Sequence, residues 1–153
     1  MAVTYVRYEA DGWGIGELVF AEGLLVHSEL PRPDGRPPEG DHPLVARLQR
    51  YFAGERVDFR DVEVELGDRT AFAQRLAGAM RAIPYGEVVT YGELSLAAGR
   101  ARAARAAGNF CAHCALAPVL PVHRVVSVSG IGGWGPRGSE YKRRLLELEG
   151  VRL

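Results

Sequence analysis

The periodicity of the apolar residues changes near residue 67, and this change limits the folds open to the chain. Before it, short runs rich in β-branched and aromatic residues are separated by glycine-containing turns; beyond it, apolar residues recur at helical spacing. The first half therefore predicts a small antiparallel sheet, and the second half predicts a group of helices. We expect an α/β (α+β) fold class with two domains, residues 1–67 and residues 68–153.

Two glycine-containing pairs, Asp11-Gly12 and Glu22-Gly23, are typical of hairpin turns and divide the sheet-forming region into three strands. The expected strands are residues 3–8, 13–20 and 23–29. Prolines and glycines are frequent from Leu30 to Asp41, which favours a loop. A helix is expected from Pro43 to Ala53, and a further strand from Val57 to Leu66.

The helical half begins with a capping residue, either Asp68 or Thr70. The expected helices are Ala71 to Ile83, Tyr91 to Ala98, and Ala101 to about Cys111. The last two are separated by Gly99-Arg100, and their spacing fits a helix-turn-helix unit. Two helices joined by a glycine turn also occur in many proteins that never touch DNA, so this signal alone is weak.

Charge is balanced over the whole chain and uneven along it. The 153 residues carry 19 basic and 19 acidic side chains, so no overall positive field points to a nucleic-acid partner. Basic residues nevertheless gather in two stretches. These are Arg100, Arg102 and Arg105, and then Arg137, Lys142, Arg143 and Arg144. A local basic face of this kind fits DNA binding and fits a solvated helix surface equally well.

The start of the sequence lacks a basic segment followed by an apolar run, and no apolar stretch reaches the roughly 18 residues of a membrane span. The two cysteines, Cys111 and Cys114, fit a reducing compartment. We therefore expect a cytoplasmic protein without a signal peptide and without membrane contact, and we expect a monomer.

The C-x-x-C spacing of Cys111 and Cys114 raises the possibility of a metal or redox site. A structural zinc site needs four ligands, and the other candidates, His27, His42 and His123, form no second pair of this kind. We expect two small, partly buried thiols at a helix end, no metal and no cofactor.

Pro121-Val122-His123-Arg124-Val125 differs by one residue from Pro-Cys-His-Arg-Val, and around it the chain resembles the O6-alkylguanine-DNA alkyltransferase family from Ile83 to Gly150. The resemblance includes the run IPYGEVVTY at 83–91, the run RAARAAGN at 102–109, the 17 positions from Arg105 to Val122, and the closing ELEG at 147–150. Members of this family move an alkyl group from damaged guanine onto the cysteine, which this chain replaces with valine.

The resemblance implies a ribonuclease-H-like N-terminal domain and a C-terminal domain whose winged helix-turn-helix binds duplex DNA in the minor groove. Small side chains in the second helix would let it enter the groove, where Arg105 fills the gap left by a flipped nucleotide. Tyr91 would help to rotate that nucleotide, and Arg102 would contact phosphate. The implied DNA-binding residues are Tyr91, Arg102, Ala104, Arg105, Ala106 and Gly108.

The resemblance also implies a pocket for the flipped O6-alkylguanine, bordered by the loop from Ile131 to Ser139. Its implied residues are Tyr91, Val122, His123, Arg124, Val125, Trp134 and Gly135. In the family, the residues matching His123 and Glu149 activate the cysteine through a water. Here they remain as a network with no nucleophile to activate, while the carbonyls of Val122 and Val125 match the acceptors for the guanine amine.

Further departures accompany Val122. Cys114 stands where the family has asparagine, Gly135 stands where it has tyrosine, and Pro136 lacks the N–H that the family donates to the guanine oxygen. Such departures resemble the alkyltransferase-like proteins, which recognise damage without transferring the alkyl group. We therefore expect a DNA-repair protein rather than an enzyme, one that binds double-stranded DNA containing O6-alkylguanine and flags it for nucleotide excision repair proteins.

Two other functions stay open. One is an active methylated-DNA–protein-cysteine methyltransferase that uses another cysteine, such as Cys114. The other is a non-specific DNA-binding or interaction module on a decayed alkyltransferase scaffold, whose DNA binding would ignore the lesion and weaken steeply with salt.

Overall fold

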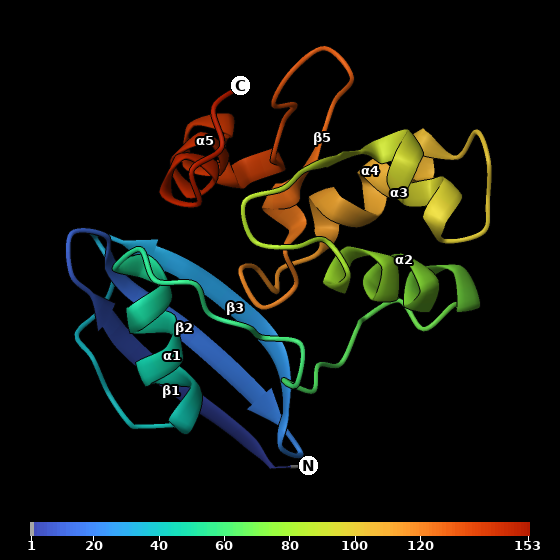
Figure 1. Ribbon diagram of the computed structural model, residues 1–153. Coiled ribbons are helices and arrows are strands. Elements are labelled where there is room, and N and C mark those ends of the chain that lie inside the picture. Colours follow the sequence, from blue (N-terminus) through green and yellow to red (C-terminus); the bar gives the residue numbers. More distant parts are fainter. Residues whose placement is uncertain (1) are drawn as a thin grey trace. The chain divides into compact units, whose positions relative to one another are not determined.

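The computed structural model describes residues 2–153, which form two compact units (Figure 1). The first consists of the chain up to Glu65 together with Ala115–Val119, and the second consists of Leu66–Cys114 and Leu120–Leu153. The expected mixed α/β fold class is confirmed. The expected domains, 1–67 and 68–153, stay a prediction. The boundary between the compact units lies after Glu65, and a short segment from the second half, Ala115–Val119, belongs to the first unit.

The first unit is built on a three-stranded antiparallel sheet in the order β1-β2-β3. Its strands are β1 (Val3–Ala10), β2 (Gly14–Ala21) and β3 (Leu24–Arg32). Helix α1 (Pro43–Phe52), as expected from the sequence, lies across one face of the sheet (Figure 1). The core between them is fully buried at Leu18, Leu25, Leu48 and Tyr51.

Strand β3 continues to Arg32, so the expectation of a loop beginning at Leu30 is wrong for its first three residues. The register explains why a proline is tolerated there. Glu17 pairs with Glu29 and Ile15 with Arg32, so Leu30 and Pro31 together oppose one residue of β2 in a bulge. A bulge residue needs no ladder hydrogen bond from its N–H, and Leu30 is buried.

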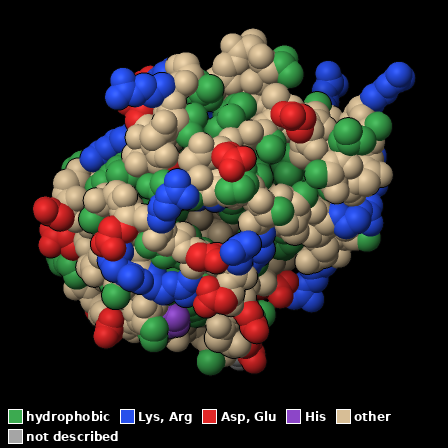
Figure 2. All heavy atoms as spheres, in the orientation of Figure 1, with side chains coloured by type: hydrophobic (Ala, Val, Ile, Leu, Met, Phe, Trp, Pro, Cys, Tyr) green, Lys and Arg blue, Asp and Glu red, His purple; other side chains and the backbone are tan. Residues whose placement is uncertain are grey.

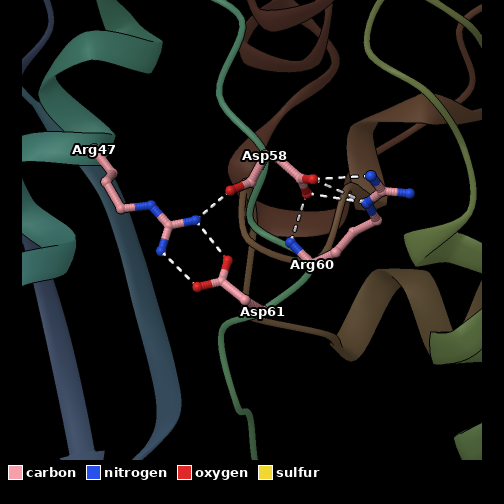
Figure 3. Close-up of polar contacts among 4 residues, drawn as sticks. All are labelled: Arg47, Asp58, Arg60 and Asp61. Carbon is pink, nitrogen blue, oxygen red and sulfur yellow. Dashed lines mark hydrogen bonds and ion pairs between the residues drawn. The ribbon is translucent and has the colours of Figure 1, made fainter.

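The strand expected from Val57 to Leu66 does not form; only Val64 makes an isolated parallel bridge to Leu25. The charged residues turn the chain instead, because the Asp58 carboxylate accepts hydrogen bonds from the backbone and side chain of Arg60 (Figure 3). Arg47 of α1 donates to Asp61 at 2.7 and 3.1 Å and also to the Asp58 carbonyl. These contacts fix the turn against α1.

The second unit is mainly helical (Figure 1). Its helices are α2 (Ala71–Arg81), α3 (Tyr91–Ala97), α4 (Ala104–His113) and α5 (Ser139–Leu148), with short 3₁₀ turns η1 (Val122–Arg124) and η2 (Gly135–Arg137). The two-residue strands β4 (Val89–Thr90) and β5 (Val125–Val126) pair in parallel. Because Tyr91 directly follows β4 and Val125 directly follows η1, this pairing places the start of α3 beside η1.

Helix ends follow local chemistry. Thr70 caps α2 by accepting a hydrogen bond from the Ala73 N–H, and this resolves the choice between Thr70 and Asp68. Thr90 and Glu93 form a capping box at the start of α3. The expected start of the next helix at Ala101 is wrong: Arg102 has a φ of 58°, which is left-handed, so α4 begins only at Ala104.

Among residues 2–153, no helix combines the length and the apolarity that crossing a membrane requires.

Candidate functional site

A buried polar cluster joins η1 to the end of α5. The carboxylate of Glu149 accepts three side-chain hydrogen bonds. They come from His123 Nε2 at 2.7 Å, Arg124 Nε at 2.8 Å and Arg124 Nη2 at 3.0 Å. The backbone N–H of Gly86 donates to the same carboxylate at 3.0 Å. Arg124 also donates to the Ile83 carbonyl at 2.8 Å, so the cluster ties three separate segments together.

The charges of this cluster follow from its burial. Burial alone would raise the pKa of Glu149, but the hydrogen bonds and charge supplied by His123 and Arg124 outweigh it and hold the pKa well below its usual range. Burial lowers the pKa of His123, against the opposing effect of Glu149. We therefore assign a neutral His123 that donates through Nε2, with the permanent guanidinium of Arg124 balancing the carboxylate.

A cavity of about 270 Å³ lies in the second unit, close to the lower end of the range of ~300–1,000 Å³ typical of small-molecule pockets. Residues from α3, α4, η1, η2, α5 and the loop before η2 line it. They are Tyr91, Gly108, Cys111, Ala112, Val122, Gly133, Trp134, Gly135 and Lys142. The cavity therefore lies where the expected pocket and the expected recognition helix meet.

Glycines allow the backbone to approach Tyr91 closely. A Cβ atom on Gly132, which has a φ of 78°, would lie 3.2 Å from the Tyr91 hydroxyl oxygen and 3.3 Å from the Ser127 nitrogen. A Cβ on Gly108 of α4 would lie 3.9 Å from the Tyr91 ring. Glycine at position 132 therefore lets the loop approach the Tyr91 hydroxyl closely, whereas a Cβ at position 108 would make an ordinary van der Waals contact with the ring.

Val122 contributes an aliphatic side chain to the cavity and is 1% exposed. Cys111, on the buried face of α4, lines the same cavity. Burial, together with the neighbouring Cys114, raises the pKa of the Cys111 thiol to about 12, although Lys142 and Arg137 act in the opposite direction. The cavity thus contains a thiol, but one held in its protonated form.

Lys142 is a buried lysine, only 1% exposed. Its Nζ atom donates to the Tyr91 hydroxyl and to the Gly133 carbonyl, each at 3.3 Å, and lies 5.4 Å from the centre of the Tyr91 ring. Burial lowers the pKa of Lys142 to about 8. The ammonium is therefore still mostly charged at neutral pH.

Trp134 is buried at 3% exposure, and its indole Nε1–H has no hydrogen-bond partner within the described chain. The Arg137 guanidinium lies 5.0 Å from the centre of the indole and donates to the Ala112 carbonyl at 3.0 Å, near the end of α4. Arg137 thereby links the loop before α5 to the last turn of α4.

Helix α4 presents a different surface on each side. Ala107 and Cys111 are buried, whereas Ala104, Arg105 and Ala106 are exposed. The exposed side near the start of the helix therefore carries small side chains around a single long cation, Arg105.

The structure brings together some of the residues expected at the pocket. Tyr91, Val122, Trp134 and Gly135 line the cavity. The remaining three do not line it: His123 and Arg124 bind Glu149, and Val125 is fully buried at the start of β5. Arg102 lies in the turn before α4, and Arg100 stacks over the Phe72 ring at 4.0 Å from its centre.

Sequence reasoning missed three lining residues, Cys111, Ala112 and Lys142. One signal for Lys142 was present, because it is the only lysine in a chain with 19 basic residues. Within residues 2–153, no three His, Cys, Asp or Glu side chains converge on a point where they could hold a metal ion.

A family model described as "6-O-methylguanine DNA methyltransferase, DNA binding domain" matches residues 71–151. A methylated-DNA–protein-cysteine methyltransferase of Metallosphaera sedula is 40% identical over 107 residues, 70% of this chain and 66% of the relative. A methylated-DNA–protein-cysteine methyltransferase of Mycobacterium tuberculosis is 46% identical over 106 residues, which are 69% of this chain and 62% of the relative. The chain thus spans less than two-thirds of the length of these curated relatives.

Solved structures match over nearly the whole chain. The crystal structure of Mycobacterium tuberculosis O6-methylguanine methyltransferase is 34% identical, with a TM-score of 0.82, and covers 99% of this chain and 95% of its own. A structure of Mycobacterium tuberculosis OGT in complex with DNA is 35% identical, with a TM-score of 0.79, and covers 95% of this chain and 92% of its own.

Proposed function

Because this chain belongs to the 6-O-methylguanine DNA methyltransferase family, we propose that it is a DNA-repair protein that binds duplex DNA and holds a flipped O6-alkylguanine without transferring the alkyl group. The observation that carries the proposal is Val122 in the wall of the cavity. Alkyl transfer to a protein requires a lone pair that attacks carbon, and an aliphatic side chain has none. Binding requires only that the cavity and the DNA-binding surface persist.

The exposed side of α4 supports the binding part of the proposal. Ala104 and Ala106 add little bulk, so this side of the helix fits a narrow groove, and Arg105 can fill the space left by an extruded nucleotide. Extrusion costs a few kcal/mol, and a stacked guanidinium recovers part of that cost. A protein–DNA structure among the relatives is consistent with this use of the fold.

The buried cluster supports a site that keeps its shape without a nucleophile. His123 and Arg124 both donate hydrogen bonds directly to the Glu149 carboxylate. A long-lived complex built on this site would mark the lesion for nucleotide excision repair proteins, which we propose as the downstream partners.

A second candidate function, alkyl transfer onto Cys111, is favoured by one observation: this thiol lines the same cavity. Its chemistry argues against it. A thiol must lose its proton to attack, and with a pKa of about 12 fewer than about one Cys111 in 10,000 is a thiolate at neutral pH. Cys114 is buried and does not line the cavity, so it is the weaker acceptor.

Intact-protein mass spectrometry separates the two candidates. The protein is incubated with a duplex that contains one O6-methylguanine, and its mass is compared with that of protein incubated with the undamaged duplex. We expect no change in mass, together with tighter binding to the damaged duplex. A gain of one methyl group that disappears in Cys111→Ser would instead establish transfer. Equal, salt-sensitive binding to both duplexes would favour the non-specific module.

A further inference from the structure

Lys142 places a positive charge in the cavity wall without a negative charge to balance it. Within residues 2–153, no Asp or Glu forms an ion pair with Lys142, and no acidic residue lines the cavity. Its two hydrogen bonds go to the Tyr91 hydroxyl and the Gly133 carbonyl, both neutral groups. A buried ammonium has three N–H donors and is costly unless it is paired, so this charge has capacity for an anionic partner.

Trp134 provides a second, independent observation at the same cavity. Its indole N–H is buried and has no acceptor among the described residues, although Trp134 lines the cavity. A buried donor left unpaired costs free energy, and native structures retain such donors chiefly where a ligand or water uses them. The cavity therefore combines an unbalanced cation with an unused donor.

The other groups around Lys142 leave its charge uncompensated. The Arg137 guanidinium, over the Trp134 ring, adds a second positive charge. Cys111 is a protonated thiol and Tyr91 a protonated phenol, because burial raises the pKa of each. His123 is neutral, because burial lowers its pKa. The titratable groups that line the cavity, Tyr91, Cys111 and Lys142, are thus neutral or positive at pH 7, and His123 beside Val122 adds no charge.

We propose that this cavity selects O6-alkylguanines whose alkyl group ends in a carboxylate, such as O6-carboxymethylguanine, over neutral O6-alkylguanines of the same shape. The inference rests on the proposed function, because it requires the flipped base to enter the cavity. Lys142 pairs with the carboxylate, and the Trp134 indole N–H donates a hydrogen bond to one of the adduct's oxygens. Lysine suits this role since it acts as a compact point charge on a flexible stem.

The test compares four otherwise identical duplexes, which carry guanine, O6-methylguanine, O6-carboxymethylguanine or O6-carbamoylmethylguanine at one position. The carbamoylmethyl group has the shape of carboxymethyl without its charge. At pH 7 and fixed salt, we expect the carboxymethyl duplex to bind about tenfold more tightly than the carbamoylmethyl duplex. Equal binding of these two, both tighter than guanine, would overturn the charge selectivity and leave the proposed function intact. If no adduct binds more tightly than guanine, the proposed function itself fails.

Two variants assign the effect. In Lys142→Met, which keeps the length of the side chain, the ratio of carboxymethyl to carbamoylmethyl affinity should fall to about one. If Lys142 instead contacted a DNA phosphate, all four affinities would fall together and the ratio would stay, which would overturn the assignment. Trp134→Phe should weaken both oxygen-bearing adducts and preserve most of the charge-dependent ratio.

The unmodified protein offers a check that does not depend on the folding of a variant. Since Lys142 is the only lysine in the chain, a single side-chain NMR signal reports its protonation in protein labelled at lysine. The pKa of Lys142 is about 8 without ligand and should rise when the carboxymethyl adduct binds. The affinity ratio should fall towards one as pH passes above the pKa in the complex. A pKa unchanged by the adduct, or a ratio independent of pH, would overturn the proposal.

Discussion

At the scale of single residues, the Glu149 carboxylate is where the buried polar contacts of the second unit converge. Gly86 N and Arg124 Nε donate to Oε1, and His123 Nε2 and Arg124 Nη2 donate to Oε2. These bonds connect the turn before β4 with η1 and the end of α5. Because these bonds to Glu149 form without a thiol at residue 122, the network has a structural role that does not depend on catalysis.

Replacing Glu149 by glutamine should therefore destabilise the protein severely. Glu149→Gln leaves the buried guanidinium of Arg124 without a counter-charge, and breaking a buried pair in this way costs about 3–5 kcal/mol. Urea denaturation measures the loss. The matched control is Glu140→Gln on α5, since Glu140 is exposed and its nearest Arg143 nitrogen is 3.8 Å away. The control should change stability by less than about 0.5 kcal/mol, and equal losses in the two variants would contradict the account.

The ion pair between Glu149 and Arg124 also predicts that the free energy of unfolding depends on pH. The pKa of Glu149 is lower in the folded state than in the unfolded chain, so its stabilisation is complete above the unfolded value of about 4.3 and is lost as pH falls towards the folded value. The difference in unfolding free energy between wild type and Glu149→Gln should shrink below that pH. A difference that stays constant down to acid unfolding would show that the carboxylate charge is not the cause.

Val122→Cys places a thiol in the cavity wall, one residue before His123. If the cavity admits the flipped base, as proposed, this variant should gain close to one methyl group per molecule from an O6-methylguanine duplex, whereas wild type gains none. Intact-protein mass spectrometry measures the gain, and the double variant Val122→Cys/Cys111→Ser identifies the acceptor. A folded Val122→Cys protein that binds the lesion but remains unmodified would mean that the base does not reach residue 122.

At the scale of secondary-structure elements, α4 separates a packing face from a small, basic face. Its start is set by the left-handed backbone of Arg102 rather than by a capping side chain, and its end is held by Arg137. The proposed DNA contact lies at the exposed start, where Arg105 is the long side chain among alanines.

Arg105→Ala should abolish the preference for damaged over undamaged DNA and reduce overall affinity by a smaller factor, about tenfold or less. The physical reason is that Arg105 is proposed to occupy the space left by the flipped base, whereas other cations supply the phosphate contacts. Binding titrations with matched duplexes measure both quantities. Arg144→Ala, which removes an exposed arginine from α5, should keep the preference; a lesion preference retained by Arg105→Ala would refute the intercalation role.

Two glycines on different elements should respond oppositely to alanine. Gly78 lies in α2 with open space around its Cβ position, so Gly78→Ala should stabilise the protein by about 0.5–1 kcal/mol. Gly86 has a φ of 81°, and its Cβ would lie 3.2 Å from the Glu149 carbonyl oxygen. Gly86→Ala should therefore destabilise it, and thermal unfolding distinguishes the two. A destabilised Gly78→Ala would show that α2 packs differently from this account.

The sequence was sufficient for elements whose signals are local. The hairpins around Gly12 and Gly23, helix α1 and the cap at Thr70 follow from turn residues, spacing and capping preferences. It was insufficient where a side chain or a backbone conformation overrides the pattern. The Arg60–Asp58 contacts turn a segment with strand-like composition, and the left-handed Arg102 delays a helix that alanine would otherwise start earlier.

The sequence predicted those residues of the candidate site that belong to the short motif at 121–125 or to the segments that resemble the family. Tyr91, Val122, Trp134 and Gly135 were expected and line the cavity. Cys111 and Lys142 were not, because their presence there depends on how the faces of α4 and α5 are turned, which linear spacing does not specify. The direct bonding of His123 and Arg124 to Glu149 likewise requires the three-dimensional arrangement.

At the scale of the whole molecule, the net charge of zero provides no overall attraction to DNA. The 19 basic and 19 acidic residues cancel, and basic and acidic side chains lie among one another on the face shown in Figure 2. Affinity that came from phosphate contacts alone would fall steeply with salt and ignore the base. A damage-recognition role therefore predicts that the preference for a lesion survives at physiological salt, because it arises in the cavity rather than in the overall field.

The most direct test of the central claim is a binding titration at physiological salt with matched duplexes that carry O6-methylguanine or guanine at one position. The account predicts a clear preference for the damaged duplex and no covalent change in the protein. Equal affinities would contradict it, because they would show that a cavity lined by Val122 no longer accepts the flipped base.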